Sequence, residues 1–184
     1  MPEMTREIAA SVLQRIEQSL FEDALAAVSA ERTAHPDRTV YAAAFWLFYG
    51  DYSQIGQPCF AVGDEEHLVE TGDPLIRWSP PDWRVSCWSN EVDPESSQSV
   101  YGQLDGEHRE ELWDWIYAEH LAAVCRVCHR LTETIRRDPA FGVAAQFVVA
   151  ILEVREGDAF FERYVRRSVS PANLVAIDLL NPIR

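Results

Sequence analysis

The chain has 184 residues, of which 47% are hydrophobic and 11% aromatic, so it can bury a sizeable core and is not an intrinsically disordered chain. Thirty acidic residues face sixteen basic ones, all of them arginine, which gives a formal charge of −14. A field of this sign repels nucleic acid and anionic membranes and attracts basic proteins.

The negative charge is concentrated in the middle of the chain. Residues 51–105 contain eleven acidic residues against two arginines, a formal charge of −9. The N-terminal residues are acidic early and lack a long apolar run, and no stretch reaches the length of a membrane span. With no export signal, we expect the four cysteines (Cys59, Cys87, Cys125 and Cys128) to be reduced thiols of a cytoplasmic protein.

The first half of the chain predicts a long helix followed by two strands. Apolar residues recur every four positions at Ile8, Val12, Ile16, Leu20, Ala24 and Val28, which predicts an amphipathic helix over residues 3–31. Residues 39–49 are apolar on both faces and predict a central strand, and residues 59–62 are expected to pair back on it. A short acidic helix is expected at 65–70. Residues 72–106 predict loops, with one short strand near 84–88 and a long acidic loop over 89–99.

The second half predicts another long helix, one strand and two short helices. The helix covers 107–137 and places one apolar face on Trp113, Ile116, Tyr117, Leu121, Val124, Cys128, Leu131 and Ile135. The strand is expected over 143–154, and the helices over 160–167 and from Pro171, after a Ser170 cap, to residue 180. This order indicates an α+β fold in a single domain over 1–184, with a small, mainly antiparallel sheet packed by two long helices and shorter C-terminal helices.

One stretch concentrates large aromatic rings next to two prolines: Arg77-Trp78-Ser79-Pro80-Pro81-Asp82-Trp83. The adjacent prolines block an α-helix and remove two backbone donors. We expect Trp78 and Trp83 to be buried and to anchor this loop to the core, and an aromatic binding surface is the alternative. Arg77 and Asp82 are placed to pair across the turn. Ser79 is not surrounded by a nucleophile elbow, so it is not a candidate nucleophile.

Cys125, Cys128 and His129 match the short haem-attachment pattern C-x-x-C-H. They lie inside the predicted second long helix, whose apolar face already includes Cys128, and Met1 and Met4 are the only methionines available as an axial ligand. A structural zinc site would need a second pair of ligands, and Cys59 and Cys87 are single in the sequence. We therefore expect packed thiols, no metal and no cofactor, with a structural zinc domain as an alternative.

Catalytic patterns are weak throughout the chain. The acidic residues fall in exposed loop sequence, and no motif singles out a pair for acid–base chemistry. Arg163, Arg166 and Arg167 could hold an anion, but a solvated helix face is the simpler interpretation. No Gly-rich phosphate loop is present. A binding protein is therefore favoured over an enzyme, and a small enzyme of unknown reaction is the alternative.

The first half of the chain resembles a bacterial family of uncharacterised single-domain proteins that carry the motif Arg-Trp-Ser-Pro-x-x-Trp. The features that carry the resemblance are the aromatic strand at 41–49, the turn after it, the acidic helix start and the motif Arg77-Trp78-Ser79-Pro80-x-x-Trp83. The resemblance covers the first half of the chain. Some members of that family are proposed immunity proteins of polymorphic toxin systems, so the resemblance implies toxin neutralisation. It brings no catalytic residue to this sequence.

These observations together predict a cytoplasmic immunity protein that binds and occludes a basic toxin domain, without cofactor or turnover, as a monomer or weak homodimer. The expected partner is a protein, and neither nucleic acid nor a membrane is expected to bind. Glu91, Asp93 and Glu95 are the strongest candidates because residues 89–99 are too polar to form a core. The complete set of candidate partner-binding residues is Asp51, Asp64, Glu65, Glu66, Asp82, Glu91, Asp93 and Glu95.

Overall fold

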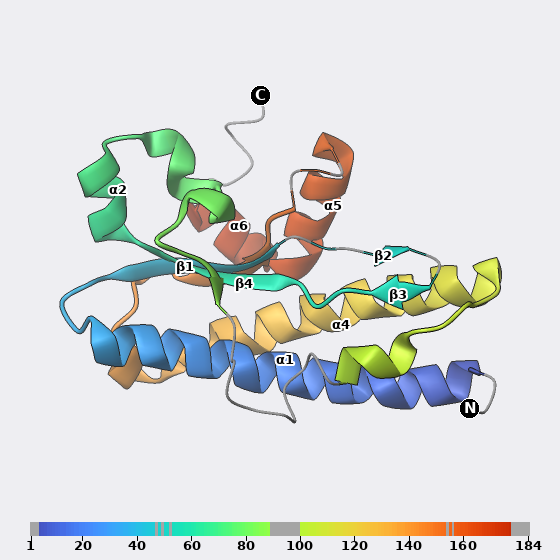
Figure 1. Cartoon of the computed structure of the whole chain (residues 1–184). Helices are drawn as coiled ribbons and strands as arrows, with labels where there is room; N and C mark the ends of the chain where they lie inside the picture. The colour runs from blue at the N-terminus through green and yellow to red at the C-terminus, as the bar shows by residue number, and fades with distance from the viewer. Residues whose placement is uncertain are drawn as a thin grey trace.

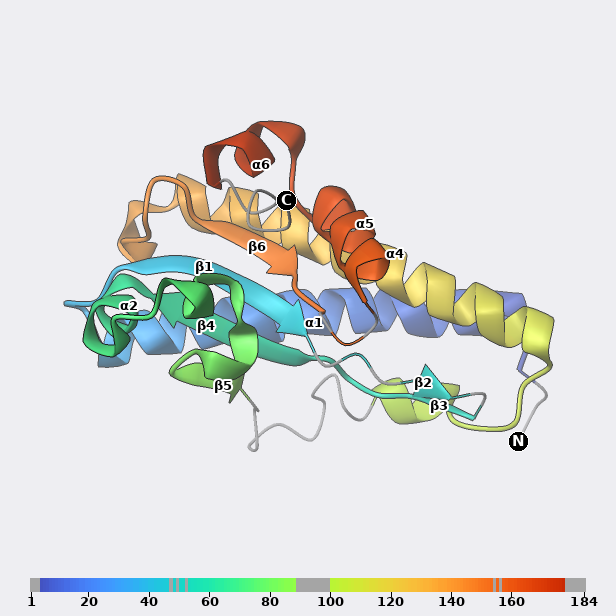
Figure 2. The ribbon, with the colours of Figure 1, turned by 90° about the horizontal axis from the view of Figure 1, so that it is seen from above.

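The computed structural model describes residues 4–46, 48, 50, 51, 53–88, 100–153, 155 and 157–177. Two long helices, α1 (Arg6–Ala34) and α4 (Glu110–Arg137), run side by side beneath a four-stranded sheet (Figures 1 and 2). Both helices begin at the same end of the molecule. Shorter helices cover the opposite face of the sheet, so the fold is α+β, as the sequence predicts.

The two long helices form where the apolar periodicity places them. The side chain of Thr5 caps α1 by accepting a 3.3 Å hydrogen bond from the backbone nitrogen of Ile8. The predicted stripe of α1 is buried from Val12 onward, but Ile8 itself is 39% exposed and lies outside the core. In α4 the predicted apolar face is buried, apart from Tyr117, which is partly exposed. Acidic residues in the first turn of α4 and arginines in its last turn suit the helix dipole.

The sheet has the strand order β5-β4-β1-β6. Strand β1 is at the centre, pairs with β4 in antiparallel and with β6 in parallel, and β5 adds to β4 in antiparallel. The pairing is therefore mainly antiparallel, as predicted. The strands are β1 (Val40–Trp46), β4 (Cys59–Asp64), β5 (Val85–Trp88) and β6 (Val148–Ile151).

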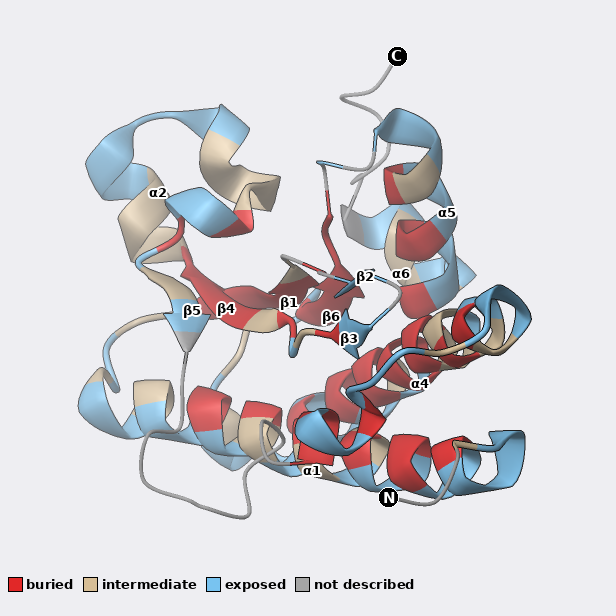
Figure 3. Ribbon diagram, turned by 45° about the vertical axis from the view of Figure 1, so that its right-hand side comes forward, coloured by how far each residue is buried: buried red, intermediate tan, exposed pale blue. Residues whose placement is uncertain are grey.

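Both faces of β1 are covered, as its continuous apolar sequence predicts. Ala43 and Phe45 join the core between the sheet and the two long helices. Ala42 and Ala44 join a second core on the other face, beneath α2 (Glu65–Thr71), α5 (Asp158–Ser168) and α6 (Pro171–Ile177). The buried residues accordingly follow the sheet and the inward sides of the helices (Figure 3). No helix in the described parts of the chain is long and apolar enough to cross a membrane.

Two predicted strands are longer in the sequence pattern than in the structure. The strand expected over 143–154 is only four residues long, because Phe147 donates to the oxygen of Ala144 and closes a turn before it. The ladder of β1 ends at Trp46, since the nitrogen of Phe48 donates to Oε2 of Glu153. A small hairpin, β2 (Gly50–Asp51) and β3 (Gln54–Ile55), was not predicted. Residues 89–99, expected to form the acidic loop, and residues 178–180 of the expected last helix lie outside the described residues.

Side-chain hydroxyls protect the outer edge of β6. The nitrogen of Val149 donates to Oγ1 of Thr132 at 2.9 Å, and the nitrogen of Ile151 donates to Oγ of Ser168 at 3.0 Å. Thr132 and Ser168 are both buried and belong to α4 and α5. These two helices therefore satisfy edge donors that would otherwise be buried without a partner.

The cysteines divide into two pairs. Cys59 and Cys87 form a disulfide between β4 and β5, so the expectation of four reduced thiols is wrong for these two. The pairing of β4 with β5 brings their Cα atoms to 4.9 Å, within the range that a disulfide requires. Cys125 and Cys128 are free and buried in the core, as expected. Burial raises the pKa of Cys125 to about 11 and that of Cys128 well above its usual value, which keeps both thiols protonated.

Candidate protein-binding surface

Most of the predicted site residues lie in the β4–β5 connection, defined here as residues 64–84. It contains α2 and two 3₁₀ turns, η1 (Pro74–Trp78) and η2 (Pro80–Asp82), and it stands above one end of the sheet (Figure 1). Six carboxylates and two arginines give it a formal charge of −4. The sequence predicted a loop for the part after α2, and the structure instead forms 3₁₀ turns that accept proline at their first positions.

Trp83 fixes this connection to the sheet. Its side chain is buried, its Nε1 donates to the oxygen of Ile76 at 2.9 Å, and its ring meets Tyr41 edge-on with centroids 5.9 Å apart. Trp78 packs against the same core and stays partly exposed. A Cβ atom at Gly63 would lie 2.9 Å from Tyr41 and 3.1 Å from Trp83, so the rings need glycine there. The expected burial is confirmed for Trp83, whereas Trp78 contacts the core but is only partly buried.

Arg77 pairs with a different carboxylate from the one expected. Its guanidinium donates to both oxygens of Glu65, at 2.8 and 3.2 Å, and lies over the ring of Tyr41. The predicted pair with Asp82 is therefore wrong, because α2 brings Glu65 to Arg77 from twelve residues away. Asp82 instead accepts a 2.5 Å hydrogen bond from the hydroxyl of Ser79. This bond closes the turn that starts at Pro80 and gives Ser79 a structural role.

Arg84 joins the two ends of the connection. It contacts Oδ2 of Asp64 at 3.5 Å and donates to Oε2 of Glu70 at 2.7 Å, and the latter bond lowers the pKa of Glu70. Asp64 is only 3% exposed and also caps α2 through the nitrogen of His67. Asp64 is therefore not available to a partner, and its place in the predicted binding set is wrong.

The other predicted acidic residues are not all in one place. Glu65 and Glu66 are partly exposed in α2, where Glu66 accepts from the nitrogen of Thr39 at 2.8 Å, and Asp82 is exposed in η2. Asp51 lies on the β2–β3 hairpin at the opposite end of the sheet (Figures 1 and 2), so it does not belong to the same surface. Glu91, Asp93 and Glu95 lie outside the described residues.

Two exposed apolar side chains were missed by the sequence analysis. Val69 on α2 and Leu75 on η1 are each 82% exposed. Among the described residues, the other exposed large apolar side chains are Ile8 and Val175, which lie on α1 and α6. Helix α2 is too short for a periodic pattern to show which of its sides faces solvent. The connection therefore presents apolar side chains among carboxylates, as a protein-binding surface does.

The pocket beside Arg77 is small. It has a volume of about 120 Å³ and is lined by Tyr41, Arg77, Trp78 and three residues from the C-terminal half, but by neither Asp82 nor a histidine. This pocket therefore does not bring Arg77, Asp82 and a histidine into one lining, although Nε2 of His67 lies 3.0 Å from the backbone oxygen of Asp82 outside it.

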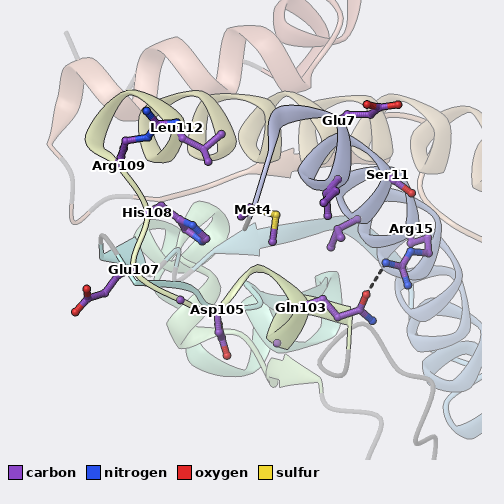
Figure 4. A pocket seen from close by; sticks show the side chains of 14 residues that line it. Met4, Glu7, Ser11, Arg15, Gln103, Asp105, Glu107, His108, Arg109 and Leu112 are labelled. Carbon is purple, nitrogen blue, oxygen red and sulfur yellow. Dashed lines mark hydrogen bonds between the residues drawn. The ribbon is translucent and has the colours of Figure 1, made fainter. Parts of the chain in front are cut away.

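A larger pocket of about 780 Å³ lies where α1 and α4 begin (Figure 4). Met4, Ile8, Val12 and Leu112 form its apolar part. Its rim mixes the acidic residues Glu7, Asp105 and Glu107 with the basic residues Arg15 and Arg109. The guanidinium of Arg15 donates a 2.5 Å hydrogen bond to the side-chain oxygen of Gln103. Nε2 of His108 donates a 2.7 Å hydrogen bond to the backbone oxygen of Leu104. The mixed rim does not select a ligand by charge.

The C-x-x-C-H stretch is part of the core of α4. Cys128 is fully buried, and Nε2 of His129 donates to the backbone oxygen of Arg167 at 2.8 Å. His120, on the same helix, is buried and hydrogen-bonds the hydroxyl of Tyr101 at 2.6 Å. Among the residues that the structure describes, no group of three or more potential ligands is placed to hold a metal ion.

No family model, curated protein or solved structure matches the chain.

Proposed function

We propose that the chain is a binding protein that attaches to a basic protein partner through the β4–β5 connection and blocks it. The observation that carries this proposal is the pair Val69 and Leu75, each 82% exposed on a segment with a formal charge of −4. Exposed apolar side chains rimmed by charge are typical of surfaces that become buried in a complex. The carboxylates give the surface its preference for a basic partner.

The connection is held in one shape before any partner binds. Trp83 is buried beneath it, and Arg77 and Arg84 pair with carboxylates inside it. A surface fixed in this way loses little conformational freedom on association, which favours affinity. The negative field raises the rate of encounter with a basic partner, and the apolar side chains slow dissociation once they are buried.

The partner we propose is the basic domain of a toxin, and the chain would act as its immunity protein. The motif at residues 77–83 supports this choice through its resemblance to a family with proposed immunity proteins. Enzymes that act on nucleic acid commonly have basic clefts, and an acidic connection can occupy such a cleft in place of phosphate. The acidic residues Glu91, Asp93 and Glu95 come shortly after β5 in the sequence and belong to the same acidic stretch of the chain, residues 51–105.

Co-expression with a toxin domain encoded beside the gene of this chain tests the proposal. The double variant Val69→Ser/Leu75→Ser should lose protection against the toxin while keeping the circular dichroism of the parent chain. Val175→Ser is the matched control, since Val175 is 84% exposed but lies on α6. Full protection by the double variant would contradict the proposed surface. If no such toxin is encoded there and no basic partner binds, the immunity function should be abandoned.

A further inference from the structure

The Cys59–Cys87 disulfide closes the base of the β4–β5 connection. Cys59 begins β4 and Cys87 lies in β5, 28 positions further along the chain, so the segment between them includes the whole proposed binding surface. The disulfide therefore ties the two ends of this segment covalently, in addition to the β4–β5 pairing and the ion pairs of Arg84. The other two cysteines, Cys125 and Cys128, lie in the core far from the segment in sequence.

The disulfide is within reach of thiols in solution. Cys87 is exposed and Cys59 is partly exposed, whereas both free cysteines are buried. Strand β5 is at the edge of the sheet, so Cys87 is not covered by a further strand of the described structure. Exposed disulfides are generally those that cellular thiols can reduce, and buried ones resist.

Among the described residues, the backbone pairing of β5 with the sheet is short and irregular. Its pairing with β4 comprises Phe60 with Trp88 and Val62 with Val85, with a register shift between the two pairs. In comparison, β1 and β4 pair at six positions. A further bond runs from Nε1 of Trp46 to the oxygen of Ser86 at 2.6 Å. The disulfide therefore adds a covalent link to a strand whose ladder with β4 is short and irregular.

We propose that Cys59–Cys87 is a redox switch for the partner-binding surface. With the bond closed, β5 and the connection are held in the binding shape, and reduction releases β5 and loosens the connection. A thiolate of glutathione or a cellular dithiol attacks one sulfur, and the other cysteine leaves as a thiolate. A second reductant thiol then resolves the mixed disulfide, so two protein thiols and one oxidised reductant disulfide result. The effect on binding rests on the function proposed above.

Hydrogen exchange measured by mass spectrometry on the full chain tests the switch without any partner. One sample is oxidised, and the other is equilibrated in a glutathione buffer as reducing as the cytosol, with alkylation to count open thiols. Cys59 and Cys87 should open, and amides in residues 65–88 should exchange about tenfold faster or more, while β1 and α4 keep their protection. The Cys59→Ser/Cys87→Ser variant should show the same fast exchange without reductant, and Cys125→Ser should respond as the parent does.

Three results would overturn the switch. The bond could stay closed in this buffer, exchange in 65–88 could be the same in both forms, or α1 and α4 could lose protection as well. The last result would show that the disulfide stabilises the whole fold and not the connection alone. Binding of the neighbouring toxin domain to the two forms separates this proposal from the previous one. If neither the oxidised nor the reduced form binds the toxin domain while hydrogen exchange still responds to reduction, the proposed function fails and the conformational switch stands. If both forms bind the toxin domain equally well, the disulfide does not control the binding surface.

Discussion

The hydroxyl of Tyr41 donates a 2.7 Å hydrogen bond to the backbone oxygen of Arg77, and the guanidinium of Arg77 lies 4.6 Å from the centre of the Tyr41 ring. Tyr41 belongs to β1, so this double contact ties the β4–β5 connection to the central strand. Burial raises the pKa of Tyr41, which keeps the hydroxyl protonated and able to donate. The shape of the proposed surface therefore depends on a contact that Arg77 makes with the sheet.

Replacing Arg77 by lysine should weaken this contact although it keeps the charge. Lysine cannot pair with both oxygens of Glu65 while lying flat on the ring of Tyr41. We expect a loss of about 1 kcal/mol in the free energy of unfolding, measured by urea denaturation, because the pair is partly exposed to solvent. Arg137→Lys is the control, since Arg137 is exposed and contacts Glu133 on its own helix. Equal losses in the two variants would contradict the role given to Arg77.

Thr132→Val should destabilise the fold through the edge of β6. The substitution keeps the shape of the side chain but leaves the buried nitrogen of Val149 without its acceptor. A buried backbone nitrogen without an acceptor lowers the free energy of unfolding by about 1–3 kcal/mol, which denaturant unfolding can measure. Thr33→Val on α1 is a matched control, because Thr33 also donates to the oxygen four residues earlier but is exposed. If both variants unfold at the same denaturant concentration, the hydroxyl does not protect this edge.

The buried His120 should make the fold sensitive to acid. Burial lowers its pKa from 6.5 to about 4, and its Nδ1 has no hydrogen-bond partner among the described residues. A depressed pKa favours the neutral form in the folded state, so this stability is present above pH 6.5 and is lost as the pH falls toward 4. The free energy of unfolding should fall by about 3 kcal/mol between pH 7 and pH 4.

Unfolding curves between pH 7 and pH 4 test this for the parent and for His120→Gln, which cannot be protonated in this range. The variant should lose less stability than the parent over this interval. His35→Gln is the control, because His35 caps the C-terminus of α1 and is not part of the core. A variant with the same pH dependence as the parent would show that His120 does not set it.

Neutralising two carboxylates of the connection should slow association with the toxin domain. Glu70→Gln and Asp82→Asn keep oxygens that can still accept from Arg84 and Ser79, so the local fold is retained. We expect a several-fold lower on-rate at low salt and a smaller difference at high salt, since salt screens exposed charges. Glu22→Gln/Glu133→Gln changes the net charge equally on α1 and α4. If the two double variants associate with the toxin domain at the same rate, the net charge of the chain matters and the position of the carboxylates does not.

The sequence predicts the parts of this fold that local pattern controls. The stripe from Val12 to Val28 and the face of α4 are buried where their periodicity places them. The continuous apolar run of β1 matches a strand covered on both faces. Trp83 is buried because a large ring beside two prolines has a fixed position and a large area to bury.

The remaining features depend on contacts between distant residues. Cys59 and Cys87, 28 positions apart in the sequence, meet only because β5 pairs with β4, and no local pattern shows this. Arg77 pairs with Glu65 because α2 folds back over the 3₁₀ turn. Asp64 is acidic and precedes the two glutamates Glu65 and Glu66 in sequence, but its position at the end of β4 buries it against Arg84. The exposure of Val69 and Leu75 likewise follows from how this segment packs.

The measurement that tests the central claim most directly is hydrogen exchange of the oxidised chain with and without the toxin domain. A partner that binds the β4–β5 connection should slow exchange of amides in residues 65–84 and leave the pocket at the start of α1 and α4 unchanged. Protection of the residues around that pocket, with none in 65–84, would contradict the proposed binding surface.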